Sequence, residues 1–400
     1  MNGAFAPERA VSAPDVAVEV VRDADRLLEL RAEWNELLRD SHSDSVFLTW
    51  EWLSTWWRHL SRGRRLFVVV ARDRGRAIAL APLVVRSPAL LSALPFPTIQ
   101  FMGTGSVGSD RLDVILRRGH EAAGIAALAG PMAGAARALE LGQVRDGASG
   151  AVALGAFLCH LGWSVAEEPT DISRYIDLSG IGWDAYLAGL GPAHRADFRR
   201  KLRRLGRDFR LSFRTVATEE RRLQALHRLI ALHRARWCGR GPSFAFHTPG
   251  HVRFHEEITR LACERGWLRF HTLWLDGAPA AALYGFKYGS TFSFYQSGFD
   301  PAFAPYSAGL VTMGLSIRSA IEERALEYDM LQGDETYKSR WARVARGVGR
   351  IELYPPRLKG RVVRGTMELS RAARRAARSL LPRRIVDRIA GGLGPAAWEG

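Results

Sequence analysis

The residues best suited to chemistry form one short charged stretch near the C-terminal end, 333–341, with the sequence GDETYKSRW. It contains two carboxylates, Asp334 and Glu335, followed by the Tyr337 phenol and the Lys338 ammonium. Acylation of an amine needs a base that takes a proton from the nucleophile and an acid that protonates the leaving thiolate, and these side chains are of the right types. The alternative is a solvated turn with local ion pairs, which usually contribute little to stability.

A second candidate is the start of an expected helix at Ser307-Ala308-Gly309. Ser307 is placed to cap this helix. Its apolar positions share one face: Leu310, Met313, Ile317, Ala320 and Ile321. The free N–H groups and the helix dipole would favour a phosphate or pyrophosphate, and the two small residues would let it come close. The other interpretation is an ordinary serine cap.

Both candidates belong to one expected strand, loop, helix and strand unit. Strands are expected at 291–296 and 328–331, because both stretches are apolar, and a loop with two prolines covers 298–306. Two parallel strands joined by a helix place the helix N-terminus beside the carboxyl ends of the strands, where α/β sheets bind ligands. The sequence therefore predicts a ligand site at this edge.

The order of expected elements repeats along the chain. A helix that contains Trp34 precedes a hairpin around Asp73, and a helix that contains Trp237 precedes a hairpin around Asp276. One face of the second helix is formed by Leu226, Leu229, Ile230, His233 and Trp237. The separation from the tryptophan to the aspartate is 39 residues in both cases. This repetition predicts two copies of one mixed α/β unit. We expect the following division: a flexible leader at 1–15, an N-terminal unit at 16–170, a C-terminal unit at 171–356 and a basic helical tail at 357–400.

The charge is concentrated in two segments. The chain has 57 basic and 41 acidic residues, a net charge of +16, and the excess lies in 195–214 and 357–388. In the first segment Phe198, Leu202, Leu205 and Phe209 follow a helical spacing, which predicts an amphipathic helix. Its other faces carry Arg199, Arg200, Arg203, Arg204 and Arg207. Such a helix could hold phosphates of a nucleotide cofactor, a tRNA or an acidic glycan, although a solvated face is the usual explanation. The second segment could rest on an anionic membrane surface or on a protein partner.

Other motifs carry less weight. The stretch 100–105, QFMGTG, spells a pyrophosphate-binding pattern, Q-x-x-G-x-G, but that pattern should open a helix, and 109–116 alternates like a strand. His247, His251 and His255 recur every four residues, but Pro249 interrupts them, so no metal site is expected. Three cysteines without a CxxC motif indicate no disulfide framework and favour the reducing cytosol. We expect no signal peptide and no membrane span, and hence a cytoplasmic protein, peripheral to the inner face of the membrane if its tail binds lipid.

Four motifs in order carry a family resemblance: FLTWEWL at 47–53, GWLRF with LDGAPAA at 266–281, YQSGFDP at 295–301 and YDMLQGDETYKSRW at 328–341. They resemble the CelD-type (cellulose-biosynthesis, BioF-like) acetyltransferases of the GNAT superfamily, and the resemblance extends over about 20–355. Relatives in the FemAB group share a tandem arrangement of two GNAT-like units.

The resemblance implies an N-acyltransferase that moves an acyl group, acetyl above all, from acyl-CoA to an amine or hydroxyl acceptor. It implies a small-molecule or glycan-linked acceptor in polysaccharide or cell-envelope biosynthesis and requires no metal. The cofactor contacts would be Gln296, Ser307, Ala308 and Gly309. The catalytic residues would be Glu335 as first choice for the base, with Asp334, Tyr337 and Lys338. The substrate contacts would be Tyr295, Asp300, Arg340 and Trp341. The stretch 306–309, YSAG, departs from the usual GNAT pyrophosphate pattern.

Two alternatives remain open from the sequence. A FemAB-like peptidyltransferase would take aminoacyl-tRNA as its donor, with the basic helix at 195–214 as a phosphate contact. A catalytically degenerate GNAT pair would serve as a scaffold and dock through the tail at 357–388.

Overall fold

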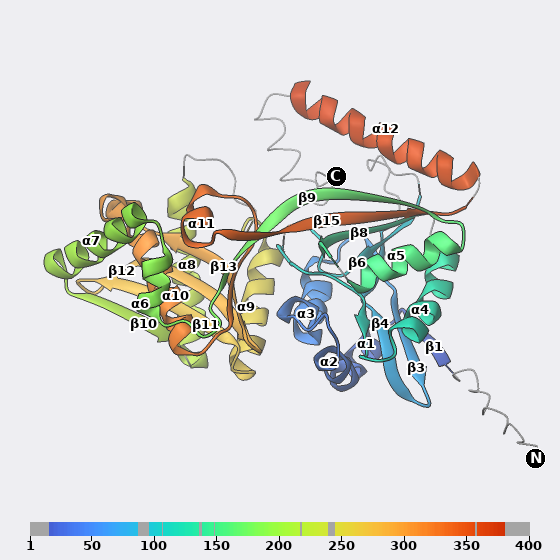
Figure 1. Ribbon diagram of the computed structural model, residues 1–400, viewed down its shortest axis with the longest axis horizontal. Helices are drawn as coiled ribbons and strands as arrows, with labels where there is room; N and C mark the ends of the chain where they lie inside the picture. The colour runs from blue at the N-terminus through green and yellow to red at the C-terminus, as the bar shows by residue number, and fades with distance from the viewer. Residues whose placement is uncertain are drawn as a thin grey trace, which may run out of the picture.

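The computed structural model describes residues 16–86, 96–105, 107–135, 138–147, 149–216, 218–238, 245–356 and 358–380. The expected leader and the end of the tail lie outside this described part. Two α/β units lie side by side in Figure 1, and two long strands run across both of them.

The N-terminal unit alternates helices with short strands. Its elements are β1 (Val16–Val21), α1 (Ala24–Glu29), α2 (Arg31–Arg39), the 3-10 helix η1 (Val46–Leu48), α3 (Trp50–Leu60), β2 (Arg64–Leu66), β3 (Val68–Asp73), β4 (Arg76–Ala81), β5 (Leu83–Arg86), β6 (Thr98–Phe101), β7 (Ile115–Leu116), α4 (Glu121–Ala135), β8 (Ala138–Arg145), α5 (Gly150–His160) and β9 (Ser164–Asp177).

The C-terminal unit follows with longer strands. Its elements are α6 (Trp183–Gly189), α7 (Pro192–Asp208), β10 (Leu211–Val216), α8 (Glu219–Trp237), α9 (Pro249–Glu264), β11 (Leu268–Leu275), β12 (Ala278–Tyr288), β13 (Thr291–Phe299), the 3-10 helix η2 (Pro301–Tyr306), α10 (Ala308–Glu322), β14 (Glu327–Gln332), α11 (Thr336–Trp341) and β15 (Val344–Tyr354). The last element of the described chain is α12 (Leu358–Leu380).

The two units repeat the same order and the same pairing. In each unit the first strand pairs antiparallel with a strand that lies after the helices, β1 with β3 and β10 with β11. In each unit a parallel pair then flanks a connecting helix, β6 with β8 across α4 and β13 with β14 across α10. The duplication expected from the equal 39-residue spacing is therefore confirmed, and the fold is mixed α/β.

The last strands of the two units are exchanged between them. The final strand of the N-terminal unit, β9, pairs antiparallel with β14 of the C-terminal unit, so that Tyr175 lies opposite Asp329. The final strand of the C-terminal unit, β15, pairs with β8 of the N-terminal unit, so that Val348 lies opposite Arg145. Because β9 and β15 also pair with each other, eleven strands join in one sheet. The expected boundary between residues 170 and 171 lies within β9.

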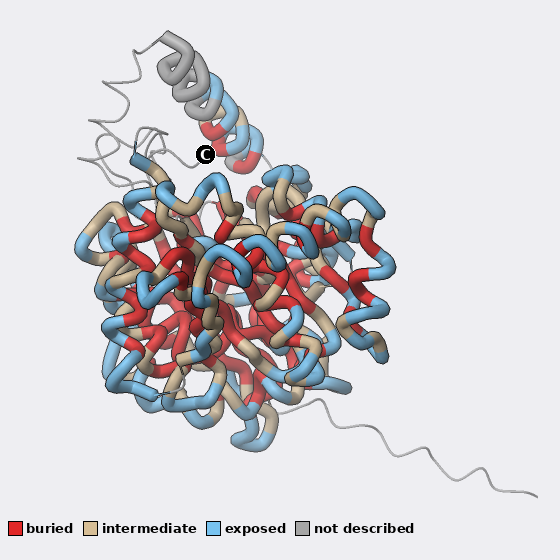
Figure 2. Tube along the Cα trace, turned by 90° about the vertical axis from the view of Figure 1, so that its left-hand side faces the viewer, coloured by how far each residue is buried: buried red, intermediate tan, exposed pale blue. Residues whose placement is uncertain are grey.

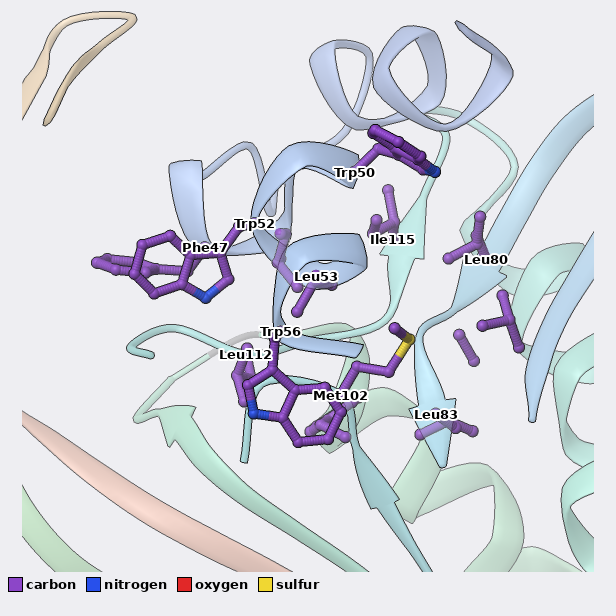
Figure 3. Close-up of a cluster of buried hydrophobic side chains, with 14 of the residues drawn as sticks. Phe47, Trp50, Trp52, Leu53, Trp56, Leu80, Leu83, Met102, Leu112 and Ile115 are labelled. Atoms are coloured by element: carbon purple, nitrogen blue, oxygen red, sulfur yellow. The ribbon is translucent and has the colours of Figure 1, made fainter. Parts of the chain in front are cut away.

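An aromatic core joins the units. Trp52 on α3 is fully buried and makes edge contacts with Phe47, Phe254, Phe286 and Tyr295, of which the last three belong to the C-terminal unit. Figure 3 shows how this side chain and its neighbours on α3 fill the space beside the strands. Aromatic residues dominate the energetics of such interfaces because each buries a large apolar area.

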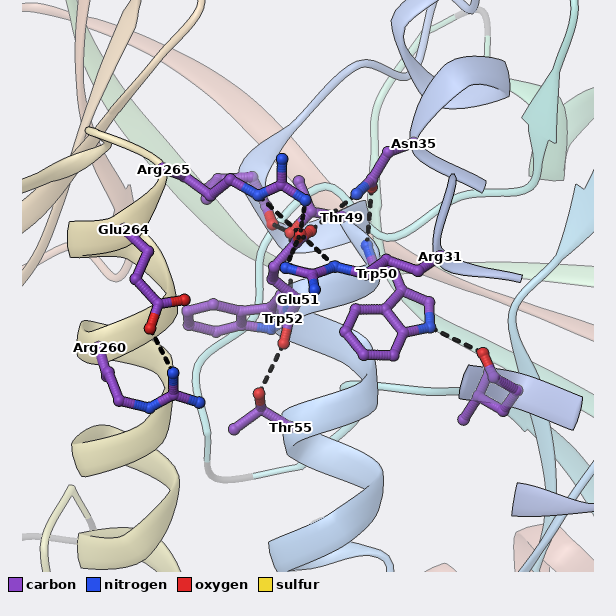
Figure 4. Close-up of polar contacts among 12 residues, drawn as sticks. Arg31, Asn35, Thr49, Trp50, Glu51, Trp52, Thr55, Arg260, Glu264 and Arg265 are labelled. Carbon is purple, nitrogen blue, oxygen red and sulfur yellow. Dashed lines mark hydrogen bonds and ion pairs between the residues drawn. The ribbon is translucent and has the colours of Figure 1, made fainter. Parts of the chain in front are cut away.

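A buried carboxylate adds a polar link at the same interface. Glu51 on α3 has no exposed side-chain surface (Figure 4). Arg31 and Arg265 contact its Oε1 atom, and the Asn35 amide donates a hydrogen bond to its Oε2 atom. Burial alone would raise the pKa of Glu51, but the hydrogen bonds from Asn35 and Arg265 outweigh it, so the pKa is lowered. Since Arg265 follows α9, this charge pair crosses between the units.

One local prediction for the N-terminal unit needs correction. Alternation in 109–116 predicted a strand, but only Ile115 and Leu116 form one. Just before this strand, Asp113 accepts hydrogen bonds from the first N–H groups of α5.

Candidate functional site

The candidate site lies where β13 and β14 part. The two strands pair only from Thr291 to Ser293, opposite Glu327 to Asp329, and then diverge. Tyr295 is an extra residue in β13 relative to β12, because Gln296 faces Tyr284 while Phe294 faces Gly285. A bulge of this kind bends a strand and ends regular pairing. The expected parallel unit is thus confirmed, and its strands open toward the start of α10.

The start of α10 has no side-chain cap. Ser307 occupies the N-cap position as expected, but its backbone is left-handed (φ 57°, ψ 43°) and its side chain makes no capping hydrogen bond. The predicted serine cap is therefore wrong in its chemistry, because the preceding η2 helix ends at the same residue and sets its backbone conformation. The first N–H groups of a helix without a side-chain cap, reinforced by the helix dipole, favour an anion.

These elements enclose a pocket of about 270 Å³. Its polar lining comes from Arg236, Ser297, Tyr337 and Arg340 together with the start of α10. Its apolar lining includes Leu283, Phe299, Met313 and Trp341. Among the described residues that line it there are two arginines and no carboxylate. The pocket therefore combines positive charge with an apolar wall.

Six of the twelve predicted site residues line this pocket. They are Ser307, Ala308, Gly309, Tyr337, Arg340 and Trp341. The backbone approaches closely here, since a Cβ atom at Gly309 would lie 3.2 Å from the Phe299 ring. At Gly298 a Cβ would lie 2.5 Å from the backbone nitrogen of His233, so this position requires glycine.

Tyr337 brings a proton donor to the pocket. Burial raises the pKa of its phenol well above the usual value, the Glu335 carboxylate adds to this rise, and the Arg236 guanidinium opposes it. The phenol therefore keeps its proton across the neutral range. A protonated phenol beside a leaving group can act as a general acid.

Glu335 and Lys338 form a pair beside the pocket. The Glu335 carboxylate is exposed and lies 2.9 Å from the Lys338 ammonium, whose side chain is buried. Lys338 also donates hydrogen bonds to the backbone carbonyls of Leu331 and Gln332, at 3.2 and 2.6 Å. These contacts occupy the ammonium within the protein, whereas one face of Glu335 stays open to solvent.

The other four predicted residues lie away from the pocket lining. Asp334 is exposed and forms an ion pair with Arg174 on β9 at 2.7 Å. Gln296 lies half-buried on β13, opposite Tyr284. Tyr295 is buried in the aromatic core, with its hydroxyl donating to the carbonyl of Val107. Asp300 caps η2 by accepting a hydrogen bond from the N–H of Ala302.

Arg236 is the principal pocket residue that sequence reasoning did not select. It lies at the end of α8, and its guanidinium stacks 5.3 Å from the Phe299 ring centroid. It follows His233 by three residues, so both belong to one side of the helix. That spacing was visible in the sequence, but only the fold shows that α8 ends against the open strand.

A basic helix borders the same region. The predicted apolar face of α7 is confirmed, since Phe198 and Leu205 are buried and Leu202 and Phe209 pack beside them. The predicted arginines are exposed, and Arg204 stacks 4.5 Å from the ring centroid of Tyr306, the residue before Ser307. This guanidinium-coated helix thus passes close to the uncapped start of α10.

The corresponding places in the N-terminal unit are closed by its own carboxylates. The Glu121 carboxylate at the start of α4 accepts hydrogen bonds from the backbone N–H groups of Glu121 and Gly119, which lowers its pKa. Asp113 caps α5 through Gly150 and Ala151 at 3.0 and 2.6 Å. Gln100, the first residue of the Q-x-x-G-x-G pattern, is buried and donates to Glu140. Among the residues that the structure describes, no helix follows the pattern directly, as expected from its context.

No group of three His, Cys, Asp or Glu side chains within the described residues could hold a metal ion. His251 and His255 belong to α9, which begins at Pro249. Burial lowers the pKa of His255 to about 3, and its ring contacts the Tyr284 hydroxyl. In the same described part of the chain, no helix is both long and apolar enough to cross a membrane.

The fold and the site together define a class of protein: a duplicated α/β chain whose C-terminal unit has a pocket, lined by two arginines, where its parallel strands diverge. The sequence profile of the acetyltransferase (GNAT) domain family matches residues 192–339, which include every residue that lines this pocket except Arg340 and Trp341. No curated protein matches the sequence.

Solved structures share the fold at low sequence identity. The crystal structure of FemX is 12% identical, with a TM-score of 0.59, and the similarity covers 80% of this chain and 95% of that one. A conserved protein of unknown function from Bacteroides thetaiotaomicron is also 12% identical, with a TM-score of 0.52 over 84% of this chain and 100% of that one. At this identity the similarity shows a common fold and nothing finer.

Proposed function

We propose that the protein is an acyltransferase that takes an acyl group, acetyl above all, from acyl-CoA and transfers it to an amine or hydroxyl acceptor. The observation that carries the proposal is the uncapped start of α10 at a pocket that also contains Arg236, Arg340 and the Tyr337 phenol. A pyrophosphate suits the helix N-terminus and the two guanidinium groups. The match of residues 192–339 to the GNAT domain family supports the same donor.

The chemistry follows from the side chains around the parted strands. The acceptor attacks the thioester carbonyl carbon, a C–N or C–O bond forms, and the carbon–sulfur bond breaks. The leaving thiolate takes the proton of Tyr337, whose raised pKa keeps it in the donor form. The positive charge of Arg236 acts on Tyr337. It stabilises the negative charge that develops on the thioester carbonyl oxygen or on the phenolate of Tyr337.

The attacking amine or hydroxyl of the acceptor must also lose a proton, and this step needs a base. Glu335 is our choice for the base, because its carboxylate is exposed beside Tyr337 and its ion pair with Lys338 fixes its position. Asp334 is the weaker candidate, because it is paired with Arg174 on β9 and is not among the charges that shift the pKa of Tyr337. The acceptor would be a small molecule or a glycan-linked group in polysaccharide or cell-envelope biosynthesis, a proposal that rests on the CelD-like motifs.

Calorimetric titration of the purified chain with acetyl-CoA tests the donor. We expect saturable binding that is lost in Gly309→Trp, because the position already lies close to Phe299 and a large side chain fills the pocket. Gly134→Trp is the matched control, since this exposed helical glycine has open space around it. Absence of binding to acetyl-CoA and to longer acyl-CoAs in the unmodified protein would overturn the proposal.

A second candidate uses aminoacyl-tRNA as the donor. The observation that favours it is the exposed arginine surface of α7, which passes beside the pocket through the contact of Arg204 with Tyr306. Binding to tRNA would depend steeply on salt, because each neutralised phosphate releases counterions. Replacement of Arg199, Arg203 and Arg207 by glutamine separates the two candidates: it should abolish tRNA binding and leave acetyl-CoA binding unchanged.

A further inference from the structure

The helix α12 carries two separate apolar stripes. Val363 and Met367 are buried against Ala138 and Tyr354 and attach the start of the helix to the protein. The second stripe, Leu358, Val362 and Leu369, is exposed to 75, 62 and 73%. These are the largest exposures among the large hydrophobic side chains of the described chain. Their spacing of four and seven residues places all three on one face of the helix.

The helix extends beyond the protein that anchors it. Figure 2 shows it projecting from the body, and its residues that are coloured as buried lie near its attachment. A helix of 23 residues is about 35 Å long, and the described side chains after Met367 are exposed. The exposed stripe therefore faces no other element of the described chain.

Positive charge accompanies this stripe. The sequence of α12 contains six arginines and one lysine against a single acid, Glu368. Arg361 is exposed, and Arg364 pairs with Glu368 at 2.8 Å on the helix surface. A helix with an exposed apolar face and arginines on its other faces is typical of one that lies in the interface of an anionic membrane. These charges also prevent it from crossing the bilayer.

We propose that α12 docks the protein on an anionic lipid surface, with Leu358, Val362 and Leu369 inserted among the acyl chains and the arginines on the headgroups. Charge complementarity favours a lipid surface over a protein partner. A protein partner for an apolar stripe would bury it in a groove, where the cations of the helix other than Arg364, which pairs with Glu368, would have to be paired one by one. An anionic membrane neutralises them collectively, at about 1 kcal/mol for each basic residue near the surface. The site of acyl transfer and this helix are separate, so the inference does not depend on the proposed donor.

Flotation of the full-length protein with vesicles tests the proposal. We expect binding to vesicles of three parts phosphatidylcholine to one part phosphatidylglycerol, little binding to pure phosphatidylcholine, and weakening as salt is raised. Arg361→Gln with Arg364→Gln should reduce vesicle affinity about 25-fold, at about fivefold for each cation.

Neutral substitutions test insertion separately from charge. Val362→Gln with Leu369→Gln should lower vesicle affinity at least tenfold, since both side chains lose their apolar contact with lipid. Leu161→Gln is the matched control, because Leu161 lies at the end of α5 with a comparable exposure of 55%. It should bind vesicles like the unmodified chain, and circular dichroism should show that all variants are folded.

Two results would overturn the proposal. One is equal binding to neutral and anionic vesicles, or none to either. The other is concentration-dependent dimerisation that the Val362→Gln and Leu369→Gln variant abolishes while vesicle binding stays unchanged, since the stripe would then cover a second copy of the chain.

Discussion

The Lys338 ammonium lies 2.6 Å from the backbone carbonyl oxygen of Gln332, the last residue of β14. Lys338 thereby holds the end of the strand that parts from β13, and its side chain is only 4% exposed. A buried cation with this set of partners positions the turn from β14 to α11. It is poorly placed to touch a substrate, although its type and sequence position suggested that role.

Replacement of Lys338 by methionine should destabilise the protein by about 1–3 kcal/mol, because the buried carbonyls of Leu331 and Gln332 lose their donor. Urea unfolding followed by circular dichroism measures this loss. Glu335→Gln is the control at the same ion pair and should change stability little, since its carboxylate is exposed. Equal stability of the lysine variant would contradict the positioning role.

Replacement of Tyr337 by phenylalanine should lower kcat about 100-fold or more while KM for acetyl-CoA changes little, because the phenol acts on the leaving group and not on donor binding. Burial raises the pKa of Tyr337, so the unmodified enzyme should not lose activity through this group as the pH rises from 7 to 9. Steady-state rates over this range provide the test. An unchanged kcat in the phenylalanine variant would remove Tyr337 from the mechanism.

Local sequence patterns predicted much of the fold. The spacing of Leu226, Leu229, Ile230 and His233 gave the buried face of α8, and Asp276-Gly277 gave the turn from β11 to β12. Both follow from interactions between residues close in sequence. The exchange of β9 and β15 does not, since pairing between Val348 and Arg145 depends on strands about 200 residues apart.

Only part of the site could be predicted, because the rest depends on how the elements pack. Ser307 and Tyr337 follow strand ends, so their position at one edge of the sheet could be inferred. The left-handed backbone of Ser307 depends on the η2 helix before it, and the arrival of Arg236 depends on how α8 packs against β13. Neither has a signature in the sequence around it.

Replacement of Asp110 by asparagine should stabilise the protein at pH 7.5. Burial, together with the nearby Asp329 carboxylate, raises the pKa of Asp110 to about 6, compared with about 3.9 in the unfolded chain. Between these values the unfolded chain loses the proton and the folded chain keeps it, so stability falls as the pH rises. The asparagine variant does not lose stability in this way. Its free energy of unfolding at pH 7.5 should therefore exceed that of the unmodified protein by about 1–3 kcal/mol.

Thermal unfolding at pH 5 and pH 7.5 measures the effect of Asp110→Asn. Asp113→Asn is the control, since the pKa of this buried carboxyl is also raised but its two oxygens cap α5. It should destabilise the protein through the lost cap. A lower melting temperature of the Asp110 variant at pH 7.5 would show that the charged form is needed at the interface.

Replacement of Glu51 by glutamine should loosen the contact between the units, at a cost of about 1–3 kcal/mol, because Arg265 loses its charged acceptor. The pKa of Glu51 is lowered in the folded protein, so the carboxylate stabilises the fold above about pH 4.3, and this contribution disappears as the pH falls through the folded value. The glutamine variant should therefore lose stability less steeply than the unmodified chain between pH 5 and pH 3. Urea unfolding at several pH values measures both effects. Arg265→Gln and the double variant complete a cycle, in which strictly additive losses would show that this pair does not couple the units.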